Sequence, residues 1–180
     1  MTTKLDMLAK LQEQKCLDNS DLLDDKKKKA SIWFASLRDE ICKSFEEIEN
    51  SELNKNTKIN FVQKKWQREG GGGGIISIMK GKIFEKVGVN ISTVYGNFSK
   101  EFRGQIPGAE ENGTFWASGI SVVSHMSNPH IPAAHMNTRL LVTGEGDNKK
   151  IWFGGGGDLT PTFEDFEVTK LFHQDLKISC

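Results

Sequence analysis

The sequence predicts an α+β domain in which a broad antiparallel β-sheet is flanked by α-helices. Residues 31–50 carry apolar side chains at three- and four-residue spacing, which is typical of an amphipathic helix. Several short β-prone segments then follow between residues 75 and 153, joined by turn-like connections. Residues 164–177 again favour a helix. Helices at both ends of a run of strands indicate an antiparallel sheet, because parallel strands need a longer crossover between each pair.

Bulk properties narrow the class of protein. A chain of 180 residues suits one domain with its own core. Its 24 basic and 24 acidic residues give no overall charge that would favour nucleic acid or an anionic membrane surface. The chain has no long apolar run for a membrane span, and acidic residues near the N-terminus argue against a transit peptide. Three scattered cysteines, Cys16, Cys42 and Cys180, favour a reducing cytoplasmic location.

The N-terminal part is expected to divide at residue 30. Residues 1–30 are polar and are predicted to form a loosely ordered arm, with a short helix at 5–15 and a solvated lysine run at 26–29. Residues 31–180 are predicted to form the domain. Ser31 is a plausible N-cap for the first helix of that domain. The apolar stripe of this helix is expected to pack on a sheet, and it consists of Phe34, Leu37, Ile41, Phe45 and Ile48.

The strands are expected to form a meander. The candidates, in order, are residues 75–79, 82–87, 89–95, 115–124, 135–143 and 150–153. Lys80-Gly81 and residues 144–149 are short enough to join antiparallel neighbours. A longer loop at residues 96–113 contains Pro107-Gly108, a turn signal.

Two glycine runs, residues 70–74 and 154–157, allow two interpretations. Neither fits a phosphate loop or a dinucleotide fingerprint. Each is either a flexible linker or a place where the backbone approaches a ligand closely. The second run has specific flanks, Trp152-Phe153 before it and Asp158 after it. Asp158 itself is either a turn or helix-capping residue or a carboxylate at the rim of a pocket.

The segment 121–139 is the most informative for function. Two β-prone halves flank Asn128-Pro129, so a hairpin is expected. Because side chains alternate along a strand, Ser121 and His125 share one face of the first half. His135, Asn137 and Arg139 share one face of the second half. A hairpin would therefore gather imidazoles, a hydroxyl, an amide and a guanidinium on one surface.

These residue types leave several kinds of chemistry open. His125, His135 and His173 could bind a metal, although their spacing is not a helical ligand pattern. His135 could instead act as a general acid or base, while His130 next to Pro129 is expected to be a turn residue. Arg139 either anchors an anionic ligand or forms a structural ion pair within the sheet.

Several motifs, taken in order, resemble the oxygen-dependent coproporphyrinogen III oxidase family. They lie at residues 66–74, 84–92, 121–139, 152–161 and 172–173, and the resemblance covers residues from about 31 to the end of the chain. The resemblance implies a broad antiparallel sheet flanked by helices and a homodimer. It also implies that two propionates of coproporphyrinogen III become vinyl groups to give protoporphyrinogen IX. Molecular oxygen would be consumed, carbon dioxide and hydrogen peroxide released, and no organic cofactor needed.

The resemblance also implies roles for individual residues. His135 matches the proposed proton donor. Ser121 and residues 137–139 (Asn137, Thr138 and Arg139) match substrate-binding positions, with Arg139 holding a propionate. Asp158 would face the pyrrole N–H groups and stabilise positive charge on the ring. His125, His135 and His173 match positions assigned to a divalent metal such as manganese in some bacterial members.

Family members continue beyond the point where this sequence stops, so the chain is expected to be truncated at its C-terminus. Two further hypotheses follow from a different class of protein. One is a non-catalytic remnant that binds a tetrapyrrole or a partner subunit. The other is a histidine metalloprotein of hydrolytic type.

Overall fold

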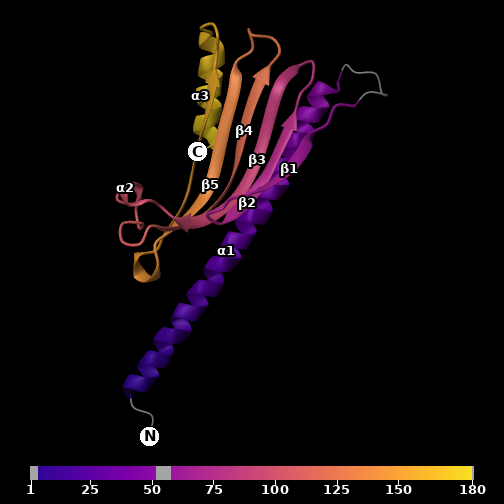
Figure 1. Ribbon diagram of the computed structural model, residues 1–180. Coiled ribbons are helices and arrows are strands. Elements are labelled where there is room, and N and C mark those ends of the chain that lie inside the picture. The colour runs from indigo at the N-terminus through magenta and orange to yellow at the C-terminus, as the bar shows by residue number, and fades with distance from the viewer. Residues whose placement is uncertain (1–3, 52–57, 180) are drawn as a thin grey trace.

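The computed structural model describes residues 4–51 and 58–179 and confirms the α+β class. Six strands form one antiparallel sheet in the order β1-β2-β3-β4-β5-β6, so every strand pairs with its neighbours in sequence. Figure 1 shows the elements, which are α1 (Lys4–Glu49), β1 (Val62–Gln67), β2 (Gly72–Met79), β3 (Phe84–Asn97), α2 (Lys100–Arg103), β4 (Thr114–Met126), β5 (Ala133–Thr143), a 3-10 turn (Gly146–Asn148), β6 (Lys150–Thr160) and α3 (Phe166–Ser179).

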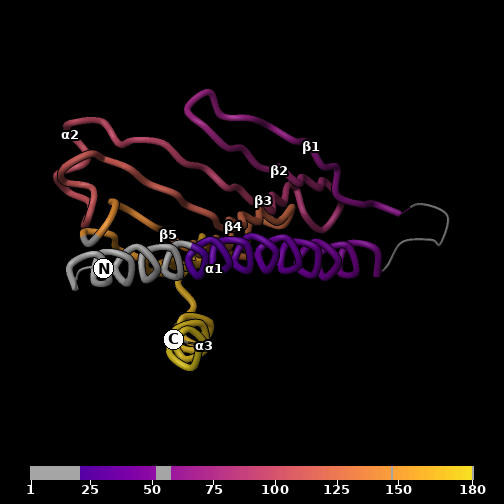
Figure 2. The backbone as a smooth tube through the Cα atoms, turned by 90° about the horizontal axis from the view of Figure 1, so that it is seen from below, coloured from indigo at the N-terminus to yellow at the C-terminus, as the bar shows by residue number. Residues whose placement is uncertain are grey.

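The core lies between α1 and one face of the sheet. The helix packs on β3 and β4, and α3 lies at the opposite edge of the sheet from β1 (Figures 1 and 2). Phe34 is 1% exposed beneath the sheet, and Phe45 meets Phe84 edge-on with ring centroids 5.1 Å apart. The buried members of this core are Ala30, Phe34, Cys42, Met79, Phe84, Val87, Val89, Ile120, Val122 and Leu140. The opposite face of the sheet is therefore available for a site.

The first helix is longer than predicted. It begins at Lys4, so the short helix expected at residues 5–15 is part of α1 and Ser31 is not an N-cap. Pairs at helical spacing, such as Lys29 with Asp25 at 2.7 Å, support the polar stretch as helix. Four members of the predicted stripe pack in the core, whereas Ile48 is 50% exposed. The separation of residues 1–30 as an arm stays a prediction.

Ser31 has a different role from capping. Its hydroxyl donates to the backbone oxygen of Lys27 at 2.9 Å and lies 3.3 Å from the Ser118 hydroxyl on β4. Ser118 in turn lies 2.9 Å from the Thr93 hydroxyl on β3. This cluster of hydroxyls ties α1 to two central strands.

Both glycine runs belong to the sheet and its turns: residues 70 and 71 lie in the β1–β2 turn, and the other glycines lie in strands. Gly72 to Gly74 open β2, and residues 154–157 lie within β6, which extends to Thr160 and not only to Phe153. A Cβ at Gly73 or Gly155 would collide with a backbone oxygen of the adjacent strand. These positions need glycine because neighbouring backbones approach closely there.

Two further strand boundaries differ from expectation. β1 was not predicted, because its sequence VQKKWQ is mostly polar and exposed. Residues 82–87 and 89–95 were expected as two strands, but β3 continues through Gly88 from Phe84 to Asn97. The turns at Lys80-Gly81 and at residues 144–149 lie where they were predicted.

A buried carboxylate holds the end of α1 to the β2–β3 turn. Glu49 is 1% exposed, and its side chain accepts hydrogen bonds from the backbone N–H groups of Lys82, Ile83 and Phe84. Charged hydrogen bonds of this kind are stronger than neutral ones. Among the described residues, no helix is both long and apolar enough to span a membrane.

Candidate functional site

The predicted hairpin is formed by β4 and β5. Ser121 pairs with Asn137, Val123 with His135, and Gly119 with Arg139, so the polar residues of both strands share one face. At its turn, the Asn128 side-chain oxygen accepts a hydrogen bond from the backbone N–H of His130 at 3.0 Å. His130 is therefore a turn residue, as expected.

His135 and Asp158 form a hydrogen-bonded pair on this open face. They are register partners on β5 and β6, and His135 Nδ1 lies 2.9 Å from Asp158 Oδ2. Their side chains remain 38% and 55% exposed, so both can meet a ligand. β6 continues past Asp158, which excludes the helix-capping interpretation. The carboxylate fixes the orientation of the imidazole and, through Nδ1, its tautomer.

Arg139 and Asn137 form the second polar pair. The Arg139 Nη1 group donates to the Asn137 Oδ1 atom at 2.7 Å. No carboxylate among the described side chains pairs with Arg139, so the ion-pair alternative finds no support there. The β6 partners of these residues are Gly156 and Gly154, and a Cβ at Gly156 would meet nothing within 4 Å. The glycines therefore leave the guanidinium and the amide uncovered.

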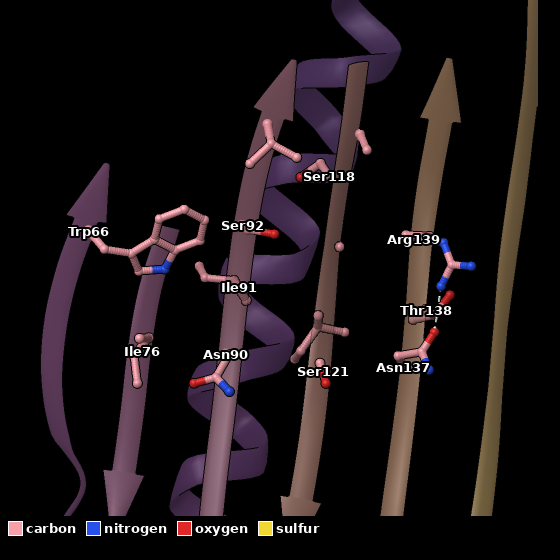
Figure 3. Close-up of a pocket in the computed structure, with 14 residues that line it drawn as sticks. Trp66, Ile76, Asn90, Ile91, Ser92, Ser118, Ser121, Asn137, Thr138 and Arg139 are labelled. Carbon is pink, nitrogen blue, oxygen red and sulfur yellow. Dashed lines mark hydrogen bonds between the residues drawn. The ribbon is translucent and has the colours of Figure 1, made fainter. Parts of the chain in front are cut away.

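The Arg139–Asn137 pair borders an open cleft of about 570 Å³, a volume within the roughly 300–1,000 Å³ of small-molecule sites. His135 does not line this cleft, and Asp158 borders a separate pocket of about 200 Å³. The cleft runs from β1 to β5, and Figure 3 shows Trp66 at one end and Arg139 at the other. The structure brings together the predicted residues Ser121, Asn137 and Arg139. Thr138 also borders the cleft, but strand alternation places its side chain on the α1 side. The lining comprises Trp66, Ile76, Asn90, Ile91, Ser92, Val94, Ala117, Ser118, Gly119, Ile120, Ser121, Asn137, Thr138 and Arg139.

Several of these lining residues, among them Trp66, Asn90 and Ser92, had no site role in the sequence-based prediction. Trp66 lies on the unpredicted strand β1, and Asn90 and Ser92 lie on β3. Asn90 is the register partner of Ser121, so its position follows once the β3–β4 pairing is known. Alternation along residues 88–92 would have placed Asn90 and Ser92 on one face, but it could not show which face was open.

The three histidines expected to bind a metal do not form a ligand set. His125 is exposed near the turn end of β4, whereas His173 lies on α3 beside a separate pocket of about 200 Å³. Within residues 4–51 and 58–179, no three histidine, cysteine or acidic side chains are grouped to hold a metal ion. The predicted grouping fails because α3 places His173 beyond β6, away from His125.

Cys42 lies outside the site. It is 6% exposed beneath the sheet, and burial raises the pKa of its thiol from 9.0 to about 11. The thiol is therefore protonated near neutral pH and is a poor nucleophile.

Comparison with known proteins finds relatives that match most of the chain. The sequence model described as coproporphyrinogen III oxidase matches residues 29–180. A protein of Rickettsia felis named oxygen-dependent coproporphyrinogen-III oxidase is 54% identical over 158 residues, which is 87% of this chain and 55% of that protein. Proteins of the same name from Rickettsia bellii and Rickettsia akari are each 54% identical, over 83% and 87% of this chain and 53% and 55% of their own length. The chain thus spans about half the length of these curated relatives, and it belongs to the coproporphyrinogen III oxidase family.

Proposed function

We propose that this chain carries the substrate-binding face of an oxygen-dependent coproporphyrinogen III oxidase of haem biosynthesis. The carrying observation is the placement of the Arg139–Asn137 pair beside the His135–Asp158 pair on the open face of the sheet. Its substrate would be coproporphyrinogen III, and molecular oxygen would be the co-substrate. The names of the relatives and the match to the family support this proposal.

Arg139 would hold one propionate of the substrate. A guanidinium can bind a carboxylate through two parallel hydrogen bonds, and Asn137 holds Arg139 in place through the 2.7 Å contact. Ser121 lies opposite Asn137 and offers a hydroxyl to the same ligand. Thr138 remains a proposed substrate-binding position only through its place in the cleft lining, since its side chain lies on the other face.

Asp158 and His135 would act at the reacting pyrrole. Each propionate loses a hydride from the carbon next to the ring, and its carboxylate leaves as carbon dioxide, which gives a vinyl group. One oxygen molecule takes this hydride together with one proton and leaves as hydrogen peroxide, so each of the two decarboxylations consumes one proton overall. Asp158 would stabilise positive charge on the ring, and His135 would supply a proton. The three histidines are not grouped among the described residues, so none of these roles is assigned to a metal.

The test is aerobic incubation of the chain with coproporphyrinogen III, followed by chromatography with fluorescence detection after oxidation of the products. Formation of protoporphyrin that is lost in Arg139→Ala supports the proposal. Binding of the tetrapyrrole without decarboxylation would instead favour the non-catalytic alternative. Neither binding nor turnover by a folded chain would contradict the proposed function.

We also propose a homodimer and a cytoplasmic location. The dimer rests on the family resemblance, and the location rests on the cysteine content together with the free, buried Cys42. Light scattering coupled to size-exclusion chromatography measures the mass directly. A mass of one chain at micromolar concentration would contradict the dimer.

A further inference from the structure

A row of five residues crosses the strands of the cleft, with large side chains at its two ends and small residues in the middle. Trp66 on β1 pairs with Gly74, Gly74 with Ser92, Ser92 with Gly119, and Gly119 with Arg139 on β5. The three middle residues are two glycines and a serine. Their small size leaves a shallow trough with an indole at one end and a guanidinium at the other (Figure 3).

Gly74 leaves the space that the indole ring of Trp66 occupies. A Cβ at Gly74 would come within 3.0 Å of Trp66 Nε1, so the absence of a side chain there lets the ring lie over β2. Trp66 is also the single half-buried side chain of β1, whose other residues are all exposed. An aromatic ring that covers a strand glycine stabilises the sheet edge. One face of the ring nevertheless borders the cleft.

The width of the trough selects the size of a ligand. Trp66 and Arg139 stand four strand spacings apart, which is about 19 Å between their backbones. A single pyrrole ring with its carboxylate arms is too narrow to contact both ends at once. A macrocycle of four such rings with carboxylate arms is wide enough.

Beside this row of residues, the floor of the cleft contains a buried hydrogen-bond acceptor. In the row next to it, Asn90 lies between Ile76 and Ser121, and its Oδ1 atom is buried without a hydrogen-bond partner among the described residues. An unpaired buried amide oxygen is unfavourable, and rotation of the amide would present it to the cleft. Pyrrole N–H groups are donors of the right kind.

On the basis of the proposed function, we infer that Trp66 is the stacking surface for one pyrrole ring of the tetrapyrrole while a carboxylate arm reaches Arg139. Trp66 is then a specificity-determining residue that distinguishes the macrocycle from smaller pyrrole acids. Gly74 and Ser92 are positioning residues, because their small size keeps the ring and the trough accessible.

The test follows each tryptophan separately. The chain contains four tryptophans, so labelling with 5-fluorotryptophan gives four ¹⁹F NMR signals, and the Trp66→Phe variant assigns the one of interest. The probe is coproporphyrin III, the stable oxidised macrocycle, whose ring current shifts only nuclei in near contact. We expect the Trp66 signal to shift on titration and the signal of Trp33, which is 52% exposed on α1, to stay in place.

Affinity, measured from the absorbance change of coproporphyrin III, gives the second readout. Trp66→Leu should weaken binding about three- to tenfold, as expected for loss of one aromatic stack, whereas Trp66→Phe should retain most of the affinity. Trp33→Phe is the matched control and should bind as the unmodified chain does. Ser92→Leu should weaken binding by filling the trough. A single-pyrrole dicarboxylic acid should leave the Trp66 signal unshifted.

The outcomes separate the two proposals. If coproporphyrin III binds and Arg139→Ala weakens it, but the Trp66 signal does not move, the inference is wrong and the proposed function stands. If coproporphyrin III does not bind to the folded chain at all, both are wrong. Should Trp66→Leu fail to fold, the NMR titration of the unmodified chain still decides.

Discussion

Glu49 offers the sharpest test of how the fold is held together. Its carboxylate is 1% exposed and accepts three backbone N–H groups from the β2–β3 turn, including that of Phe84 at 3.0 Å. Glu49→Gln keeps the shape of the side chain, but it replaces one carboxylate oxygen with an NH₂ group that faces backbone N–H donors. At least one buried N–H then loses its acceptor, which costs about 1–3 kcal/mol, and the remaining bonds lose their charge assistance.

We therefore expect Glu49→Gln to lower the free energy of unfolding by about 2–4 kcal/mol. Urea denaturation followed by far-UV circular dichroism measures this quantity, and the melting temperature should fall by roughly 4–16 °C. The matched control is Glu47→Gln on the same helix, whose exposed carboxylate makes only a 3.8 Å pair with Lys43. That control should change stability by less than about 0.5 kcal/mol.

The reasoning is refuted if Glu49→Gln unfolds within about 0.5 kcal/mol of the unmodified chain. Gly81→Ala approaches the same interaction from the other side, because its Cβ would collide with the Glu49 carboxylate. It should destabilise the chain as well, and the two substitutions together should cost less than the sum of their separate effects.

Three further predictions concern other parts of the molecule. Because the pKa of Cys42 is raised, the protonated thiol contributes to the free energy of unfolding fully below pH 9.0, and this contribution is lost as the pH rises towards about 11. Urea titrations across this range should show a loss of roughly 2–3 kcal/mol. Gly155→Ala should destabilise β6 by more than 1 kcal/mol, because its Cβ would collide with the Asn137 backbone oxygen, whereas Gly156→Ala should be mild. Asp158→Ala should reduce the turnover number of coproporphyrinogen III far more than its affinity, if the carboxylate acts on transition-state charge.

Each of these predictions has a clear contrary result. An unchanged alkaline stability profile in Cys42→Ala would show that another group causes the loss. Equal unfolding free energies for Gly155→Ala and Gly156→Ala would contradict the close approach of β5 and β6. A loss of affinity in Asp158→Ala with normal turnover would assign that carboxylate to binding alone.

The hairpin and its polar face were predictable from sequence. Alternation along a strand depends only on backbone geometry, so Ser121, Asn137 and Arg139 could be placed on one face before the register was known. The Asn128-Pro129 turn then brought the two strands together. What alternation could not supply was the partner strand of His135, and hence the 2.9 Å contact with Asp158.

The glycine strands were not predictable by the same reasoning. Glycine has a low intrinsic preference for strands, and residues 154–157 carry no side-chain pattern to read. Their extended form is imposed by pairing with β5, where a Cβ at Gly155 has no room. Trp66 was not predicted as a site residue for a related reason. Its strand β1 is mostly polar, and the pairing of β1 with the glycines of β2 depends on the folded sheet and not on the local sequence.

The length of α1 was underestimated because its polar N-terminal portion has few apolar residues. Periodicity detects a helix only where one face is buried, and the main core contacts of α1 begin at Ala30 and Phe34, with Leu23 as the one earlier side chain described as buried. The ion pairs Lys27–Asp24 and Lys29–Asp25 were visible as charges in the sequence. Their helical spacing was a signal that could have extended the prediction.

The order of the strands has a consequence for how the chain assembles. Each strand adds to the one made just before it, so the sheet can grow one hairpin at a time during synthesis, with a short loop to close at every step except between β3 and β4. The first helix is the exception. Its apolar face can pack on β3 and β4 only after the ribosome has synthesised the chain as far as Met126. We therefore expect a chaperone, or contacts with the emerging strands, to shield that face until the middle of the sheet has formed.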